Sequence, residues 1–135
     1  MAFNSLGLPK TILHAIEENK LTKPYPIQEM SIPKAMNGLD ILGIAKTGSG
    51  KTLAFALPIL SKLSKFKRLK SRKISGLILV PTRELAEQVK DVFNQIGPIL
   101  PNKVRTMAVY GGVSINPQMK NLYGCLLYTS DAADD

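Results

Sequence analysis

A glycine-rich turn between a short apolar run and a helical stretch constrains the fold of this 135-residue chain more than any other feature. The apolar run covers residues 40–45, the turn is Thr47-Gly48-Ser49-Gly50, and the helical stretch begins at Lys51. A P-loop has two glycines separated by four residues and followed by Lys and Ser or Thr. The pattern fits here, except that Ala45 stands in place of the first glycine. We therefore expect a buried strand, a phosphate-binding loop and a helix, in that order.

The chemistry of a P-loop gives each residue type a role. The two later glycines let the backbone curl so that successive N–H groups face phosphate oxygens. The helix start adds the positive end of its dipole. We expect Lys51 to reach the β- and γ-phosphates and Thr52 to place its hydroxyl on Mg²⁺. The alternative is a strand-to-helix turn without a ligand. The predicted nucleotide-binding residues of this loop are Ala45, Lys46, Thr47, Gly48, Ser49, Gly50, Lys51 and Thr52.

Hydrophobic periodicity and turn residues divide the rest of the chain into helices and strands. Strand, helix, strand, helix and strand with short connections are typical of a parallel α/β sheet. Buried strands are expected at residues 40–45 and 76–80, and a third strand at residues 104–110. The expected helices cover residues 9–19, 26–36 with an interruption at Pro33, 51–65 with Pro58 inside, and 82–96, and a last helix could open at residue 116.

The composition restricts the class of protein. Hydrophobic residues make up 44% of the chain and charged residues 21%, as in ordinary globular proteins. No apolar run approaches the ~18–20 residues that span a bilayer, and no secretory signal is visible at the start. The single Cys forms no internal disulfide, which suits a reducing compartment. We therefore expect a cytoplasmic protein with no membrane segment and no disulfide partner.

The charge is positive and unevenly spread. A formal charge of +8 points to polyanionic partners. Residues 62–73 carry a run of Lys and Arg without an acid, whereas three acids lie within residues 131–135. The basic run is either a solvated loop or a source of salt-dependent affinity for a polyanion.

Three segments in a fixed order now carry a resemblance to a known family. These are Pro24-Tyr25-Pro26-Ile27-Gln28, the loop at residues 45–52 and Pro81-Thr82-Arg83-Glu84-Leu85-Ala86. Together they resemble the DEAD-box family of ATP-dependent RNA helicases, of bacterial type, over residues 3–122. The resemblance implies an α/β fold, namely a partial RecA-like P-loop NTPase domain with a parallel sheet and flanking helices. It also implies that the chain is a truncated, N-terminal fragment of the first RecA-like domain.

The resemblance also implies functional residues outside the loop. Gln28 would read the adenine edge, because an amide offers both a donor and an acceptor, and Phe3 matches the upstream aromatic of the glutamine motif. Taken alone, Gln28 favours a surface position on a helix, and the neighbouring P-loop favours the adenine contact instead. The residues implied to bind RNA are Pro81, Thr82, Arg83, Gly111 and Gly112. Their plain alternatives are a helix cap at Thr82, a solvated Arg83 and an ordinary glycine turn.

The family resemblance divides the chain into three parts. Residues 1–29 form the glutamine-motif region, and residues 30–124 form the truncated N-terminal part of the ATP-binding RecA-like domain. Residues 125–135 resemble a translated sequencing adaptor and are predicted to be a non-native tail, with a natural acidic tail as the alternative. Because the family neighbours of the P-loop strand are missing, we expect open sheet edges and marginal stability.

The predicted function is ATP-dependent RNA remodelling with ATP and Mg²⁺ as cofactors and RNA as partner. A second RecA-like domain is expected but absent from this chain. The sequence holds no Asp-Glu-Ala-Asp tetrapeptide, whose acids act on Mg²⁺ and water in this family, so we expect the fragment to be inactive as an ATP hydrolase. The alternatives are another P-loop NTPase, such as a DNA helicase or a kinase, and a basic nucleic-acid-binding module that uses no nucleotide.

Overall fold

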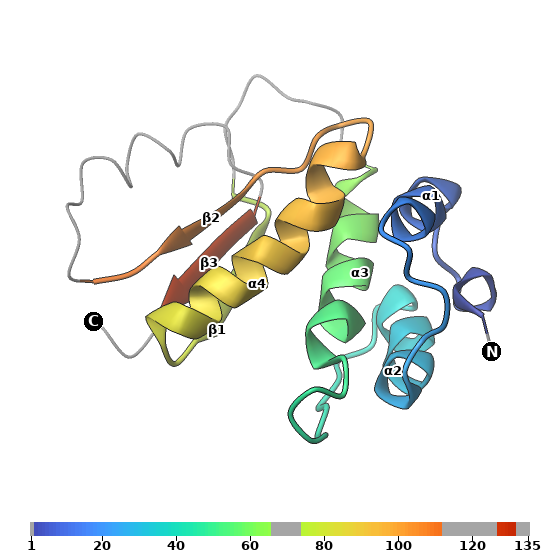
Figure 1. Ribbon diagram of the computed structural model, residues 1–135, viewed down its shortest axis with the longest axis horizontal. Coiled ribbons are helices and arrows are strands. Elements are labelled where there is room, and N and C mark those ends of the chain that lie inside the picture. Colours follow the sequence, from blue (N-terminus) through green and yellow to red (C-terminus); the bar gives the residue numbers. More distant parts are fainter. Residues whose placement is uncertain (1, 66–73, 112–126, 132–135) are drawn as a thin grey trace.

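The computed structural model describes residues 2–65, 74–111 and 127–131. In Figure 1, helix α4 lies across a three-stranded sheet, α3 lies next to α4, and α1 and α2 lie on the side of α3 away from the sheet. The elements in chain order are η1 (Phe3–Ser5), α1 (Lys10–Glu18), α2 (Pro26–Met36), α3 (Lys51–Leu63), β1 (Gly76–Val80), α4 (Arg83–Ile96), η2 (Gly97–Ile99), β2 (Thr106–Val109) and β3 (Leu127–Asp131).

The sheet is parallel, as the alternation of strands and helices predicts. Its order is β1-β3-β2, and β3 pairs in parallel with both neighbours. Gly76 of β1 and Thr106 of β2 both stand opposite Leu127, so the three strands start in register. Helix α4 connects β1 to β2 and packs on the sheet, which is the crossover that parallel strands require. The strand-helix-strand part of the sequence interpretation is therefore confirmed.

The central strand comes from the segment that the sequence assigns to a tail outside the domain. Residues 127–131 lie between β1 and β2 and pair with both along their length. The pairing is made by backbone groups, which every residue except proline carries as donor and acceptor. A strand position in this sheet is thus filled whatever the origin of the segment, and the origin stays a prediction. The helix expected to open at residue 116 lies outside the described residues.

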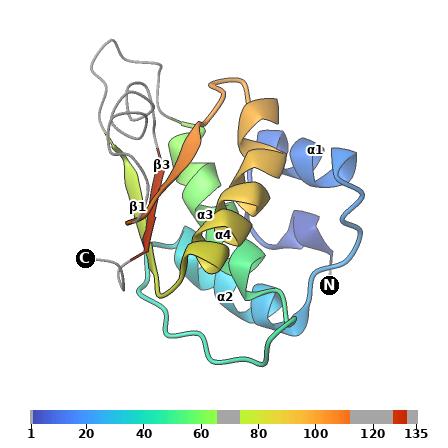
Figure 2. The ribbon, with the colours of Figure 1, turned by 60° about the vertical axis from the view of Figure 1, so that its left-hand side comes forward.

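Only one face of the sheet is covered within the described part of the chain. In Figure 2 the helices lie together on one side of the sheet. Val80 is buried against that side, whereas Leu77 is 58% and Leu79 64% exposed. The expectation of a fully buried strand at residues 76–80 is therefore wrong. A strand alternates its side chains between two faces, and here the second face has no cover among the described residues.

The run at residues 40–45 is not a strand, contrary to its sequence pattern. No regular structure is assigned to residues 39–46, and Leu42 is 86% and Ile44 83% exposed. A strand forms only when its backbone groups find partners on a neighbouring strand. In the described sheet, β1, β3 and β2 leave this segment without such a neighbour. Apolar composition alone therefore predicted the wrong structure and the wrong burial.

Helix α3 carries the hydrophobic core. It contacts α1, α2 and α4, and its side chains Leu57 and Leu60 are fully buried. Phe93 of α4 meets them from the sheet side and is also fully buried. The C-terminus of α3 is held by Asn102, whose Nδ2 donates to the carbonyl of Leu63 at 2.5 Å. The helical half of the molecule and the sheet half are thus joined through α3 and α4.

The predicted helices are present with small differences at their ends. Pro9 is the N-cap of α1, and Thr82 caps α4 by accepting a hydrogen bond from the N–H of Leu85 at 3.2 Å. Helix α2 continues through Pro33, so the expected interruption there is wrong. A proline removes one backbone hydrogen bond, and the packing of α2 against α3 is sufficient to keep the helix continuous.

The exposure of the 40–45 run leads to a testable contrast. We expect Leu42→Gln to change the free energy of unfolding by no more than about 0.5 kcal/mol, because the side chain is exposed. The matched change Leu60→Ala should destabilise the protein by about 2–5 kcal/mol, because it leaves a cavity in the core. Urea titration followed by circular dichroism measures both. A loss for Leu42→Gln as large as that for Leu60→Ala would show that the run is buried.

Candidate nucleotide site and nucleic-acid interface

The predicted phosphate-binding loop has the backbone form that its glycines allow. Gly48 and Gly50 have φ angles of +80° and +87°, in the left-handed region. The N–H of Ser49 donates to the carbonyl of Lys46 at 3.2 Å, which closes the turn. Gly50 is the N-cap of α3, so the loop leads directly into the N-terminus of a thirteen-residue helix. The turn and the helix dipole therefore lie where an anion-binding loop needs them.

The Gln28 side chain joins α2 to this loop. It is 2% exposed, and its Oε1 accepts a hydrogen bond from the N–H of Tyr25 at 3.0 Å. Its Nε2 donates to the carbonyl of Gly50, also at 3.0 Å. The alternative that Gln28 is a surface residue is therefore wrong. Both halves of the amide are used inside the protein, so the glutamine motif and the loop form one hydrogen-bonded unit.

Lys51 folds back over the loop. Its ammonium donates to the carbonyl of Ala45 at 2.6 Å, while the residue as a whole is exposed. An ammonium has three donors, so this bond leaves capacity for phosphate oxygens. The Lys51 side chain thus lies at the mouth of the loop from which a phosphate would approach.

The loop contains one buried hydroxyl group of interest, that of Ser49. Its hydroxyl oxygen is buried and has no hydrogen-bond partner among the described residues. A buried polar group without a partner costs ~1–3 kcal/mol, and a ligand oxygen at the loop would remove that cost. Together with the two left-handed glycines, this orphaned hydroxyl fits a loop built to hold an anionic ligand. The next hydroxyl along the chain, that of Thr52, is half-buried in the first turn of α3.

A hollow beside the loop is the candidate site for the base and sugar of a nucleotide. Its volume is about 310 Å³, and it lies between the start of α2 and the loop. Phe3 is not part of it, because its ring is 5% exposed and packs in the hydrophobic core. The lining residues are Tyr25, Pro26, Ile27, Met30, Ile44, Ala45, Gly48 and Ser49.

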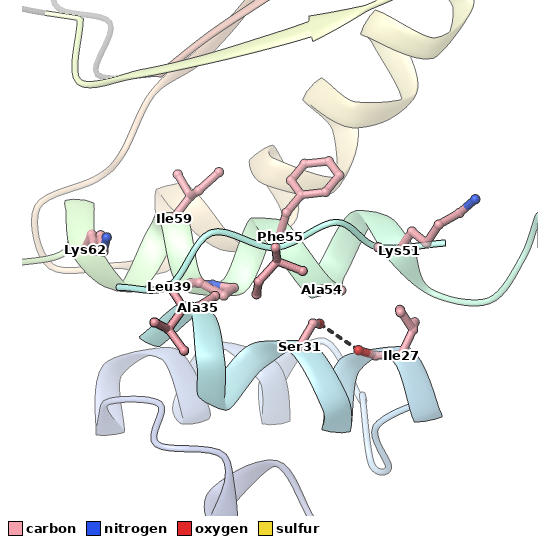
Figure 3. Close-up of a pocket in the computed structure, with 12 residues that line it drawn as sticks. Ile27, Ser31, Ala35, Leu39, Lys51, Ala54, Phe55, Ile59 and Lys62 are labelled. Atoms are coloured by element: carbon pink, nitrogen blue, oxygen red, sulfur yellow. Dashed lines mark hydrogen bonds between the residues drawn. The ribbon is translucent and has the colours of Figure 1, made fainter. Parts of the chain in front are cut away.

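A second and larger hollow was not indicated by the sequence pattern. Its volume is about 420 Å³, and Figure 3 shows it between α2, α3 and the segment at residues 39–43. Most of its lining is apolar, including Ile27, Phe55 and Ile59, with Lys62 at one end. The hollow exists because the 40–45 run crosses the two helices and does not enter a sheet. The apolar pattern of that run predicted a strand, so the sequence did not indicate this hollow.

The residues predicted to bind RNA gather at the carboxyl ends of β1 and β2. Pro81, Thr82 and Arg83 follow β1 directly and are exposed, and Arg83 is the first residue of α4. The guanidinium carbon of Arg83 lies 6.0 Å from the ring centre of Tyr110, which follows β2 and precedes Gly111. The structure therefore brings residues 81–83 and Gly111 to one edge. Gly112 lies outside the described residues.

Two side chains at this edge were missed in the sequence interpretation. The hydroxyl of Tyr110 donates to Oε1 of Glu87 at 2.9 Å, and the ammonium of Lys90 lies 2.6 Å from Oε2 of the same carboxylate. The hydrogen bond from Lys90 lowers the pKa of Glu87 below its usual value, and the hydrogen bond to Glu87 raises the pKa of Tyr110. The available signal was that Tyr110 precedes the glycine pair and that Glu87 lies one helical turn after Arg83.

Comparison with known proteins places these features in context. A family model described as DEAD/DEAH box helicase matches residues 25–133. The chain is 44% identical over 121 residues to the ATP-dependent rRNA helicase RRP3 of Debaryomyces hansenii, covering 90% of this chain and 24% of that protein. It is 43% identical over 119 residues to DEAD-box ATP-dependent RNA helicase 3 of Helianthus annuus, covering 84% of this chain and 49% of that protein.

Solved structures agree with these matches. A DEAD box protein from Methanococcus jannaschii superposes with a TM-score of 0.83 at 36% identity, covering 96% of this chain and 34% of that one. The RNA helicase Prp28 from Chaetomium thermophilum, bound to ADP, superposes with a TM-score of 0.82 at 32% identity, covering 95% of this chain and 31% of that one. The chain spans about a quarter of the length of the Debaryomyces relative. Within the described residues, no helix has the length and apolarity needed to cross a membrane.

The two left-handed glycines of the loop provide a matched pair of variants. Gly50→Ala would drive a methyl group into Gln28 and Tyr25, whereas at Gly48 the same methyl group meets nothing within 4 Å. Both changes strain a left-handed residue by ~1–2 kcal/mol, so the difference between them measures the contact alone. We expect Gly50→Ala to be the more destabilising by at least ~1 kcal/mol in urea titration. Equal effects would show that the Gln28 amide is not packed against Gly50.

Proposed function

Because the chain belongs to the DEAD/DEAH box helicase family, we propose that it is part of the first RecA-like domain of an ATP-dependent RNA helicase. The observation that carries this proposal is the pair of hydrogen bonds through which Gln28 joins Tyr25 to Gly50. This bond pair links the two segments that the proposed ATP site needs. The superposed Prp28 structure is bound to ADP, which supports an adenine nucleotide as the ligand.

In the proposed site, the loop and the start of α3 hold the phosphates. Lys51 would exchange its bond to the Ala45 carbonyl for phosphate oxygens, and Ser49 would gain a partner for its buried hydroxyl. Thr52 would hold Mg²⁺ through its hydroxyl. ATP supplies the phosphoryl group whose transfer to water drives the helicase cycle, and Mg²⁺ neutralises its charge. The backbone of Lys46, Thr47 and Gly48 completes the proposed cradle.

The adenine would occupy the hollow lined by Tyr25 and Met30. An adenine that uses Gln28 would replace one of the two internal bonds of that amide. Reading by an amide favours adenine over guanine, because adenine has a donor at N6 beside the acceptor N7, whereas guanine has the acceptor O6 there. For Phe3, which is buried in the core, the adenine contact stays a prediction.

The proposed RNA contacts lie at the edge formed by residues 81–83 and 111–112. A guanidinium and exposed backbone N–H groups at a helix start suit phosphate oxygens. The role of Thr82 as a helix cap is compatible with RNA binding, because a hydroxyl that caps α4 also fixes the direction of the helix start.

The proposal extends to the organisation of the whole protein. We divide the chain into a glutamine-motif region at residues 1–29, the ATP-binding region at 30–124 and a tail at 125–135 of adaptor origin. The complete protein would add a second RecA-like domain and act on RNA in the cytoplasm. Its bacterial type stays a prediction, since the relatives described above come from fungi, a plant and an archaeon.

Ligand-dependent unfolding tests the nucleotide site. With Mg²⁺·ATP at 100 times its dissociation constant, the free energy of unfolding should rise by ~2.7 kcal/mol. Lys51→Ala should abolish the rise, because it removes the ammonium at the loop. The matched variant Lys62→Ala, which removes an exposed ammonium from the other end of α3, should keep it. Thermal unfolding followed by circular dichroism, with Mg²⁺·GTP in parallel, measures the effect.

Other outcomes of the same experiment select other functions. Equal protection by GTP and ATP would favour a different P-loop NTPase. RNA binding that survives Lys51→Ala, with no protection by any nucleotide, would favour a basic nucleic-acid-binding module. If the chain is the proposed helicase fragment, it should release no phosphate from ATP. RNA-stimulated release that Lys51→Ala abolishes would contradict this proposed inactivity.

A further inference from the structure

We propose that Tyr110 is a positioning residue that holds the Arg83 guanidinium at the edge where RNA phosphates would bind. The inference rests on the proposed RNA-binding function and deepens it, because it assigns a role to a side chain outside the three sequence motifs. The edge is formed by the start of α4 and the end of β2, which are brought together by the packing of α4 on the sheet.

The contact between the two side chains has the geometry of a cation–π pair. The guanidinium carbon of Arg83 lies over the Tyr110 ring at 6.0 Å from its centre. Planar guanidinium groups bind aromatic faces in this way and keep their N–H groups directed outward in the plane. A guanidinium that lies over the ring can therefore still present its donors to a phosphate.

The hydroxyl end of the Tyr110 side chain is held by α4. Its hydroxyl donates to Glu87 Oε1 at 2.9 Å, and Lys90 holds the other oxygen of that carboxylate at 2.6 Å. The Glu87 carboxylate accepts the phenol hydrogen bond, and the hydrogen bond from Lys90 lowers its pKa further below its ordinary value. The ring thus has a fixed orientation before any ligand arrives. Because Glu87 and Lys90 belong to α4, this chain of contacts ties the end of β2 to the helix that carries Arg83.

Order in the arginine matters because its side chain is long and exposed. A free arginine samples many rotamers, and binding a phosphate must restrict them. Stacking on Tyr110 restricts them in advance, and the neighbouring Gly111 continues the same edge toward the proposed RNA contact. Loss of the ring should therefore weaken RNA binding through Arg83, whereas loss of the hydroxyl alone should matter less.

The test compares two variants of Tyr110 in the 135-residue chain. Binding of a fluorescein-labelled single-stranded oligouridine is measured by anisotropy across a range of salt concentrations. We expect Tyr110→Leu to weaken binding by about two- to fivefold, the range of an exposed cation–π pair, and Tyr110→Phe to bind within about twofold of the original chain. In an Arg83→Ala background, Tyr110→Leu should have no further effect. Equal effects of Tyr110→Leu with and without Arg83 would assign Tyr110 a merely structural role and overturn the proposal.

The salt dependence of RNA binding and the NMR signal of Arg83 test the role of Arg83 directly. Arg83→Ala should reduce the slope of log affinity against log salt by about 0.7, the value of one phosphate contact to a single strand, whereas Lys10→Ala on α1 should leave it unchanged. In the NMR spectrum, the Arg83 Nε–H signal should show an upfield ring-current shift that Tyr110→Phe keeps and Tyr110→Leu removes.

The two levels of proposal fail in distinguishable ways. If the original chain does not bind the oligonucleotide, the proposed RNA function is overturned, and the role of Tyr110 with it. If the chain binds but Tyr110→Leu behaves like Tyr110→Phe in both readouts, only the positioning role is overturned. Circular dichroism melting of each variant ensures that the comparison is made on folded protein.

Discussion

The buried amide of Gln28 holds the start of α2 against the phosphate-binding loop, and the candidate nucleotide site depends on that contact. A buried amide must satisfy a donor and an acceptor, and here the Tyr25 N–H and the Gly50 carbonyl satisfy both. A glutamate would lose the hydrogen bond to the Gly50 carbonyl, which would keep only the N–H of Ala54 as a donor. An aliphatic side chain would in addition remove the acceptor of the Tyr25 N–H. Because Gly50 is also the N-cap of α3, this contact fixes where the helix with Lys51 begins.

Local rules predicted the helices well and the strands only in part. Caps, periodicity and helix-stopping residues lie within a few positions of each other, so α1, α3 and α4 follow from the sequence. The run at residues 40–45 has the composition of a strand, but a strand depends on partners far away in the chain. The exposure of Leu77 and Leu79 has the same cause, since no local pattern says whether the second face of a sheet is covered.

The candidate site was likewise predicted from the sequence only in part. The P-loop pattern predicted the left-handed glycines and the helix start because these are consequences of neighbouring residues. The internal partners of Gln28 could not be predicted, since they require α2 to lie against the loop. Tyr110 was missed because its partners, Arg83 and Glu87, become neighbours only when α4 packs beside β2. Pairings between distant elements thus mark the limit of reasoning from one sequence.

The strand order also determines when the sheet can assemble during synthesis. In the part of the chain that the structure describes, β1 and β2 are not paired with each other, and each pairs with β3, which follows both of them in the sequence. A nascent chain leaves the ribosome from its N-terminus, and its leading parts fold first. Helices α1, α2 and α3 can therefore associate while two parallel strands still lack the strand between them. The three-stranded sheet forms only once residues 127–131 have left the ribosome, so a ribosome stalled before them would hold an assembled helical half and two unpaired strands.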